Sequence, residues 1–255
     1  MSKRKNIPGI HNYCDRWCER CTFTSCCAVA EMDESLSPEQ RDMNNEAFWN
    51  RLSDNFKKAI ELLHKSAEKY GIDLTEINTS EANAAYKKHE KELRSALKKH
   101  PLSELSLKYA DQTHKFLKDN SLFENAGNEL LQHFEIGISS EEETMQKAHR
   151  LKDCVEVVSW FEHFIYVKLQ RALSGLMEDD GWEEENGFQR DCDGSAKTVL
   201  ISVEKCLQAW VYLYEILPQK EDEILQQLAL LQQIKKFTEQ NFPKAWSFKR
   251  PGFDD

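Results

Sequence analysis

Apolar residues recur at intervals of three and four along most of the chain, which is the spacing of an α-helix that buries one face. Pro38, Gly71, Pro101, Pro218 and Pro243 stand at the ends of these periodic segments, where proline and glycine start or stop helices. The pattern predicts about six helices, with a break near residues 120–121 in the third. They cover residues 37–70, 80–100, 103–136, 140–177, 195–217 and 220–241.

The strongest pattern lies in segment 140–177. Ser140 and Glu143 have the spacing of a capping box, which starts a helix. After them comes a seam at alternating steps of three and four: Ala148, Leu151, Val155, Val158, Glu162, Ile165, Leu169, Ala172 and Leu176. The next helix presents a comparable apolar face: Ala196, Val199, Val203, Cys206, Trp210, Leu213 and Leu217. Their connection predicts that these two helices form an antiparallel pair.

Composition supports a fold made only of helices. The chain has 255 residues but only 9 Gly and 6 Pro, whereas β-sandwiches and barrels need many turn residues. We therefore expect an all-α bundle (37–243) that follows a cysteine-rich leader (1–36). The tail (244–255) carries Trp246, Phe248 and Phe253, which predicts that it docks on the bundle. Leader, bundle and tail are expected to form one domain.

Charge and hydropathy exclude several classes of function. The net charge of −10 argues against a nucleic-acid partner, because binding a polyanion needs clustered positive charge. No apolar run reaches the roughly 18 residues of a membrane span. The start, MSKRKN, is not followed by the apolar stretch of a signal peptide, which predicts a cytoplasmic location. In that reducing compartment cysteines stay as thiols or bind metal.

The cysteines are concentrated in the leader. Five of the 8 cysteines fall between Cys14 and Cys27, where an even distribution would place fewer than one. Thiolates are soft ligands that suit zinc or an iron–sulfur cluster. The predicted ligands are Cys14, Cys18 and Cys21 with either Cys26 or Cys27, and His11 is an alternate.

The spacing also constrains the backbone and the metal. Cys14 and Cys21 would be about 10 Å apart along a regular helix, too far for one metal centre, so a metal-binding leader cannot be one helix. The leader cysteines all lie in one short run. This arrangement resembles the cysteine runs of bacterial ferredoxins more than the two separate knuckles of most zinc sites, and it favours an iron–sulfur cluster by a small margin. Buried small residues or a thiol redox switch are the competing interpretations.

Two motifs carry a resemblance to a known group of proteins. The leader reads HNYCDRWCERC and then TFTSCC, and residues 191–197 read DCDGSAK. With these motifs the chain resembles a set of uncharacterised bacterial helical proteins that have an N-terminal cysteine cluster. The resemblance implies no activity. It implies that Cys27 is the fourth ligand, which leaves Cys26 as the extra cysteine.

A second candidate site lies in the bundle. Glu162 occupies the apolar seam of segment 140–177, where an unpaired carboxylate is costly. His163 and Glu156 lie on the same helix, and Glu204 lies on the next one. These four residues are candidates for a carboxylate and histidine metalloenzyme site. The simpler interpretation is that Glu162 is buried and paired with Lys168, Lys197 or an arginine.

The leading functional hypothesis is a helical protein that binds a metal through its N-terminal cysteines. The alternatives are a partner-binding scaffold with a structural zinc knuckle and the bundle metalloenzyme. The sequence does not decide whether the chain is an enzyme, and a protein partner or a homo-oligomer stays open.

Overall fold

The computed structural model describes residues 5–74 and 80–254, which contain helices and no β-strand. The chain divides into two compact units. The N-terminal unit comprises Met1–His11 and Cys18–Arg94, and the bundle unit comprises Asn12–Trp17 and Ser95–Asp255. The all-α prediction is confirmed, and there are more helices than the six expected, because the predicted segments 37–70 and 103–136 are each divided in two.

The N-terminal unit begins with short turns and ends in long helices. Three 3₁₀ turns come first: Ile10–Asn12, Cys18–Arg20 and Thr24–Cys26. The first of these turns ends in the bundle unit. They are followed by α1 (Ala28–Glu34), α2 (Pro38–Arg41) and α3 (Glu46–Tyr70). Helix α5 (Ser80–Lys99) starts in this unit and ends in the bundle unit.

The first long helix starts later than predicted. Ser37 and Gln40 form the expected capping box, but the helix that they start ends after one turn at Asp42, whose backbone is extended. Asn45 then caps α3 by accepting a hydrogen bond from the Ala47 amide. Two competing helix starts therefore divide the predicted helix into α2 and α3.

The apolar face of α3 is not a core face within its own unit. Phe56 is 62% exposed, Ile60 54% and Leu63 57%, and Ala67 is the one buried residue of this helix. Helical periodicity predicts which side chains share a face, but it does not say that a neighbouring helix covers that face.

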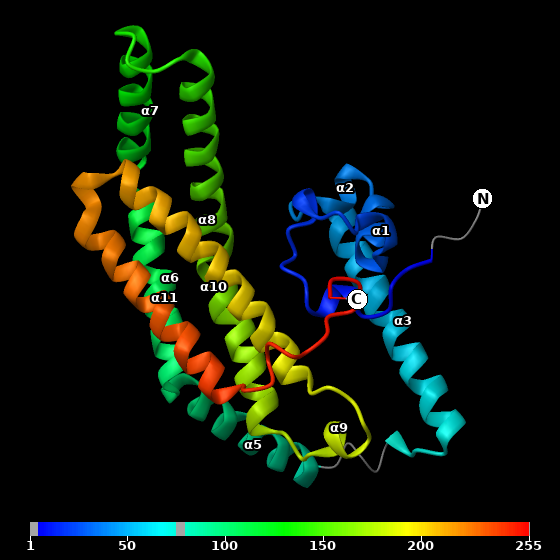
Figure 1. The fold of residues 1–255 in the computed structure, drawn as a ribbon. Helices are drawn as coiled ribbons and strands as arrows, with labels where there is room; N and C mark the ends of the chain where they lie inside the picture. The colour runs from blue at the N-terminus through cyan, green and yellow to red at the C-terminus, as the bar shows by residue number, and fades with distance from the viewer. Residues whose placement is uncertain (1–4, 75–79, 255) are drawn as a thin grey trace. The chain divides into compact units, whose positions relative to one another are not determined.

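The bundle unit contains the predicted antiparallel pair. Helices α8 (Glu141–Met177) and α10 (Asp191–Ile216) run side by side in Figure 1, and they make the most extensive contact between any two of the described helices. Helix α6 (Pro101–Leu117) packs on α8, and α11 (Glu221–Asn241) packs on both α10 and α6. Helix α7 (Asn120–Glu135) packs on α8, and the short α9 (Trp182–Glu185) lies in the connection before α10.

The core of the bundle follows the predicted apolar faces closely. Trp210 is fully buried, and its indole donates to the Tyr109 hydroxyl at 3.1 Å. All seven residues predicted for the α10 face are buried: Ala196, Val199, Val203, Cys206, Trp210, Leu213 and Leu217. The break in the third predicted helix is confirmed between Leu117 and Asn120.

The start of α10 differs from the prediction. The helix begins at Asp191 and not after residue 193, and Arg190 occupies the N-cap position. Asp193, which precedes the predicted segment 195–217, lies in the first turn of the helix, is 2% exposed and pairs with Arg190 at 2.8 Å. The ion pair keeps this buried carboxylate satisfied.

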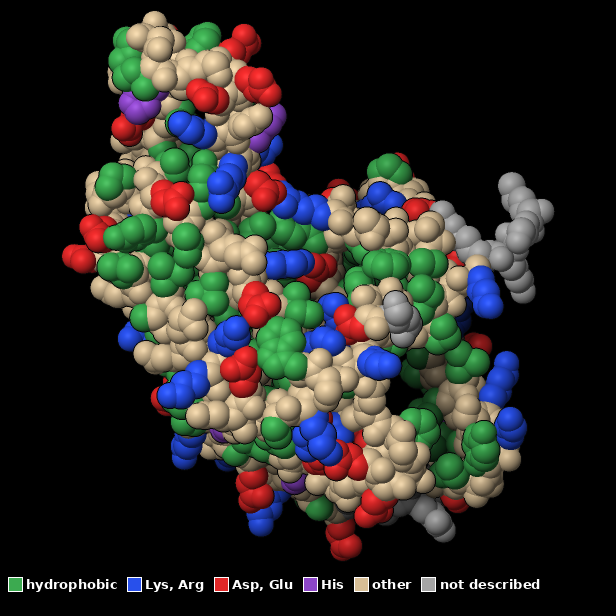
Figure 2. All heavy atoms as spheres, viewed as in Figure 1, with side chains coloured by type: hydrophobic (Ala, Val, Ile, Leu, Met, Phe, Trp, Pro, Cys, Tyr) green, Lys and Arg blue, Asp and Glu red, His purple; other side chains and the backbone are tan. Residues whose placement is uncertain are grey.

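The surface shows no feature of a membrane span. No helix in the described part of the chain is both long and apolar enough to cross a bilayer. On the face shown in Figure 2, acidic and basic side chains are interspersed over both units.

Replacing Leu169 with alanine is expected to destabilise the bundle by about 2–5 kcal/mol, because this leucine is fully buried and leaves a cavity. The matched change Leu63→Ala on α3 should cost about 1 kcal/mol or less, since that side chain is already 57% exposed. Urea unfolding followed by circular dichroism measures both variants. Equal losses at the two positions would contradict the burial described here.

Candidate functional site

Residues 12–17, here called the strap, lie against α8 and α10 within the bundle unit. The Tyr13 hydroxyl donates to Asp191 Oδ1 at 2.8 Å, and the Tyr13 carbonyl accepts from the Thr198 hydroxyl at 3.2 Å. Burial and the neighbouring Asp191 carboxylate raise the pKa of Tyr13 well above its usual value. The phenol therefore stays protonated and holds the strap at the start of α10.

The second half of the strap has its own anchors. Asp15 pairs with Lys205 at 2.9 Å, and its carbonyl accepts from the Trp160 indole at 2.9 Å. The Trp17 ring stacks on Trp160 with 4.9 Å between ring centroids and 11° between planes. Between these anchors Arg16 has φ 60°, in the left-handed region that residues other than glycine rarely adopt.

A buried lysine lies beneath the strap. Lys168 on α8 is 8% exposed, donates to the Asn12 carbonyl at 3.0 Å and lies over the Phe164 ring. Burial and the nearby Arg171 lower the pKa of Lys168, and Cys14 of the strap opposes that shift. The strap therefore supplies polar partners for a charge that the bundle buries.

The motif at residues 191–197 receives both the strap and the C-terminal tail. A Cβ on Gly194 would lie 2.4 Å from a ring carbon of Tyr13 and 2.6 Å from one of Phe248, so glycine allows both rings to approach α10. Lys197 donates to the Phe248 carbonyl at 2.6 Å. The predicted docking of the tail is confirmed, and the two sequence motifs are in contact.

The leader cysteines are divided between the units. Cys14 belongs to the strap, whereas Cys18, Cys21, Cys26 and Cys27 belong to the N-terminal unit. No group of three ligating side chains in the described leader converges within 4.8 Å. All eight cysteines of the chain are thiols, so disulfides do not constrain the leader.

Cys18 and Cys21 lie at the two ends of a short turn in which one sulfur accepts a hydrogen bond. The Cys21 amide donates to the Cys18 carbonyl at 3.1 Å and closes a 3₁₀ turn. The Phe23 amide then donates to Cys21 Sγ at 3.4 Å, and the Cys26 thiol donates to the Phe23 carbonyl, also at 3.4 Å. Metal-bound thiolates commonly occur at such C-x₂-C turns and accept hydrogen bonds of this kind.

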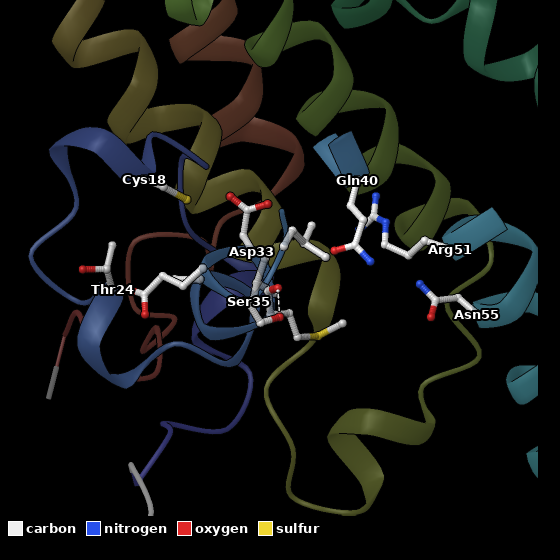
Figure 3. Close-up of a pocket in the computed structure, with 12 residues that line it drawn as sticks. Cys18, Thr24, Asp33, Ser35, Gln40, Arg51 and Asn55 are labelled. Atoms are coloured by element: carbon white, nitrogen blue, oxygen red, sulfur yellow. Dashed lines mark hydrogen bonds between the residues drawn. The ribbon is translucent and has the colours of Figure 1, made fainter. Parts of the chain in front are cut away.

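A hollow of about 690 Å³ opens beside Cys18 in the N-terminal unit. Figure 3 shows Cys18 on one side of it and Arg51 and Asn55 of α3 on the other. Arg51 Nε is shielded from solvent and makes no hydrogen bond to the described residues. Cys18 lines this hollow and is an exposed residue.

Two of the four bundle candidates, Glu156 and Glu204, pair with lysines. Glu156 pairs with Lys152 on the preceding turn at 3.8 Å, and Glu204 pairs with Lys235 of α11 at 3.1 Å. Neither is among the ligating groups that converge within 4.8 Å in the described residues.

Glu162 and His163 do come together, with a residue that the sequence did not indicate. Glu162 Oε1 lies 3.3 Å from Nδ1 of His114 on α6 and 3.6 Å from Nε2 of His163. Glu162 therefore pairs with histidines and not with Lys168, Lys197 or an arginine of the described residues. Lys168 instead bonds the strap, and Lys197 bonds the tail. His114 lies among lysines in the sequence, which is typical of a surface residue, and its contact with Glu162 joins two different helices, so no local pattern indicates it.

Comparison with known proteins gave no match to a family model, a curated protein or a solved structure. The resemblance of the two motifs to bacterial helical proteins therefore stays a prediction.

Replacing Gly194 with alanine is expected to displace Tyr13 or Phe248 and to cost about 1–3 kcal/mol, because the new Cβ overlaps both rings. Gly127→Ala in α7 is the matched control, since nothing lies within 4 Å of its Cβ position, and it should stabilise by about 0.5–1 kcal/mol. Chemical denaturation of both variants tests this. Equal stability changes would contradict the close contact at Gly194.

Thiol reactivity should separate the leader from the bundle. Burial raises the pKa of Cys192 to about 11 and that of Cys206 to about 12. At pH 8 only about one in a thousand and one in ten thousand of these thiols is a thiolate, which is the reactive form. Alkylation of metal-free native protein, mapped by mass spectrometry, should label Cys18 first and leave Cys206 unmodified until the chain is unfolded. Equal labelling rates for Cys18 and Cys206 in the native state would refute the predicted difference in reactivity.

Proposed function

We propose that this chain is a metal-binding helical protein whose N-terminal cysteines hold a thiolate-ligated metal centre. The observation that carries the proposal is the concentration of five cysteines within 14 residues, two of them at a turn with an amide directed at one sulfur. Thiolate ligands are tuned and oriented by hydrogen bonds of this type.

The backbone of the leader supports the proposal. A regular helix would keep the cysteines too far apart for one centre. The cysteine-bearing part of the leader, residues 14–27, instead contains 3₁₀ turns and extended residues such as Cys27, which has φ −113° and ψ 121°. Such a backbone can close around an ion as the ligands bind, because metal binding and local folding are coupled.

The ligands that we propose are Cys14, Cys18, Cys21 and Cys27, with Cys26 and His11 as alternates. The metal is an iron–sulfur cluster or zinc. Both are compatible with a four-thiolate set, and the spectrum of the purified protein separates them.

The test is anaerobic purification of the full chain, followed by metal and sulfide analysis and an ultraviolet–visible spectrum. Iron with sulfide and visible charge-transfer absorption would establish a cluster, and about one equivalent of zinc without visible absorption would establish a zinc site. Neither metal near one equivalent would overturn the proposal.

Single variants identify the ligands. Cys21→Ser should weaken metal retention by at least about tenfold, since losing a ligand costs more than losing an outer-shell partner. Cys154→Ala, which removes a thiol from α8, is the control and should retain the metal. Loss in only one of Cys26→Ser and Cys27→Ser identifies the fourth ligand, and equal retention in Cys21→Ser and the control would contradict the ligand set.

A further inference from the structure

A second group of metal-ligating side chains lies on the bundle, separate from the cysteines. His114 of α6 and Glu162 and His163 of α8 each offer one ligand atom, and these atoms all lie within 4.8 Å of one another. All three residues belong to the bundle unit, and α6 and α8 pack directly against each other. The group therefore has a fixed scaffold.

The distances agree with a shared ion. Two atoms that bind one tetrahedral ion at about 2.0–2.2 Å lie about 3.3–3.6 Å apart. The two measured separations from Glu162 Oε1 are 3.3 Å to His114 and 3.6 Å to His163. Little rearrangement of these side chains is needed to place an ion between them.

The second oxygen of Glu162 is an independent indication. Oε2 is shielded from solvent and makes no hydrogen bond to any described residue. A buried carboxylate oxygen without a partner is costly, and in native structures such atoms usually contact a water or an ion. A cation beside Glu162 would satisfy this carboxylate.

The surroundings hold Glu162 in place and leave the histidines open. Its neighbours on α8, Phe161 and Ile165, are fully buried, and the Glu162 side chain is 13% exposed. The side chains of His114 and His163 are 48% and 56% exposed. An ion could enter from solvent and keep positions for water or another ligand, as catalytic metal sites do.

We propose that His114, Glu162 and His163 form a binding site for a first-row divalent transition-metal ion. Two imidazoles and one carboxylate are the donor set of zinc sites and of non-haem iron sites. Magnesium and calcium prefer oxygen ligands alone, so they are not the expected ions. Open coordination positions make an oxygen-donor ligand, such as water or a small carboxylate, the expected fourth ligand.

The test uses the full chain with the five leader cysteines replaced by serine, so that thiolates do not compete. Co²⁺ is titrated and followed by its visible absorption, and Zn²⁺ is then used to displace it. We expect about one equivalent of Co²⁺ to bind. Glu162→Gln and His163→Ala should each weaken binding by at least about tenfold. His149→Ala, which removes another exposed histidine of α8, is the matched control and should bind as the parent does.

Equal Co²⁺ affinity in His163→Ala, His149→Ala and the parent would overturn the proposal and leave a simple ion pair. So would a parent that folds but binds no Co²⁺ at millimolar concentration. If the serine variant does not fold, the same comparison is made in the wild-type chain, where sulfur-to-metal charge-transfer bands identify thiolate-bound cobalt. This site and the thiolate centre can fail independently, because each test removes the ligands of only one of them.

Discussion

The bundle depends on the close approach between the end of α8 and the start of α10, on either side of the loop that connects them. At Gly175 on α8 an added Cβ would lie only 3.1 Å from the Cβ of Cys192 on α10, so a larger residue would require Cys192 to shift by a few tenths of an ångström. This contact brings Arg171 of α8 within 2.7 Å of Asp191. The same aspartate receives Tyr13, so the strap depends on a pairing between helices that it does not itself form.

The interior of the bundle also shows how a helical protein accommodates charge in an apolar seam. Lys168 and Glu162 are both on α8, and neither pairs with the other. The lysine donates to a backbone carbonyl of the strap, whereas the glutamate has one oxygen near two imidazoles and the other without a hydrogen-bond partner among the described residues. Since unpaired buried charge is costly, such residues persist where a partner is supplied from outside the seam.

Most of the fold could be predicted from the spacing of apolar residues, because α8 and α10 each bury one continuous face. The starts of helices were less predictable, because Ser37 and Asn45 are both good caps and only the three-dimensional context decides between them. The exposed face of α3 could not be anticipated either, since periodicity carries no information about what packs on a face.

The two candidate sites also differ in how far the sequence could predict them. The turn between Cys18 and Cys21 could be predicted, because both cysteines lie within one short segment and their spacing can be read from the sequence. The pairing of Glu162 with His114 joins residues 48 positions apart, and no local pattern reports such a contact. The position of Glu162 in an apolar seam was the one sequence signal that pointed to it.

The left-handed backbone at Arg16 has a consequence for how the strap comes off. Such a conformation costs a non-glycine residue of the order of 1 kcal/mol, and it persists because anchors hold the chain on both sides. If Tyr13 or Trp17 is released, Arg16 can relax, so the first anchor leaves at a free-energy cost that is lower by the strain released. The strain also opposes rebinding of that anchor. Residues 12–17 should therefore detach stepwise, through states in which one end of the strap is free and the other is still attached.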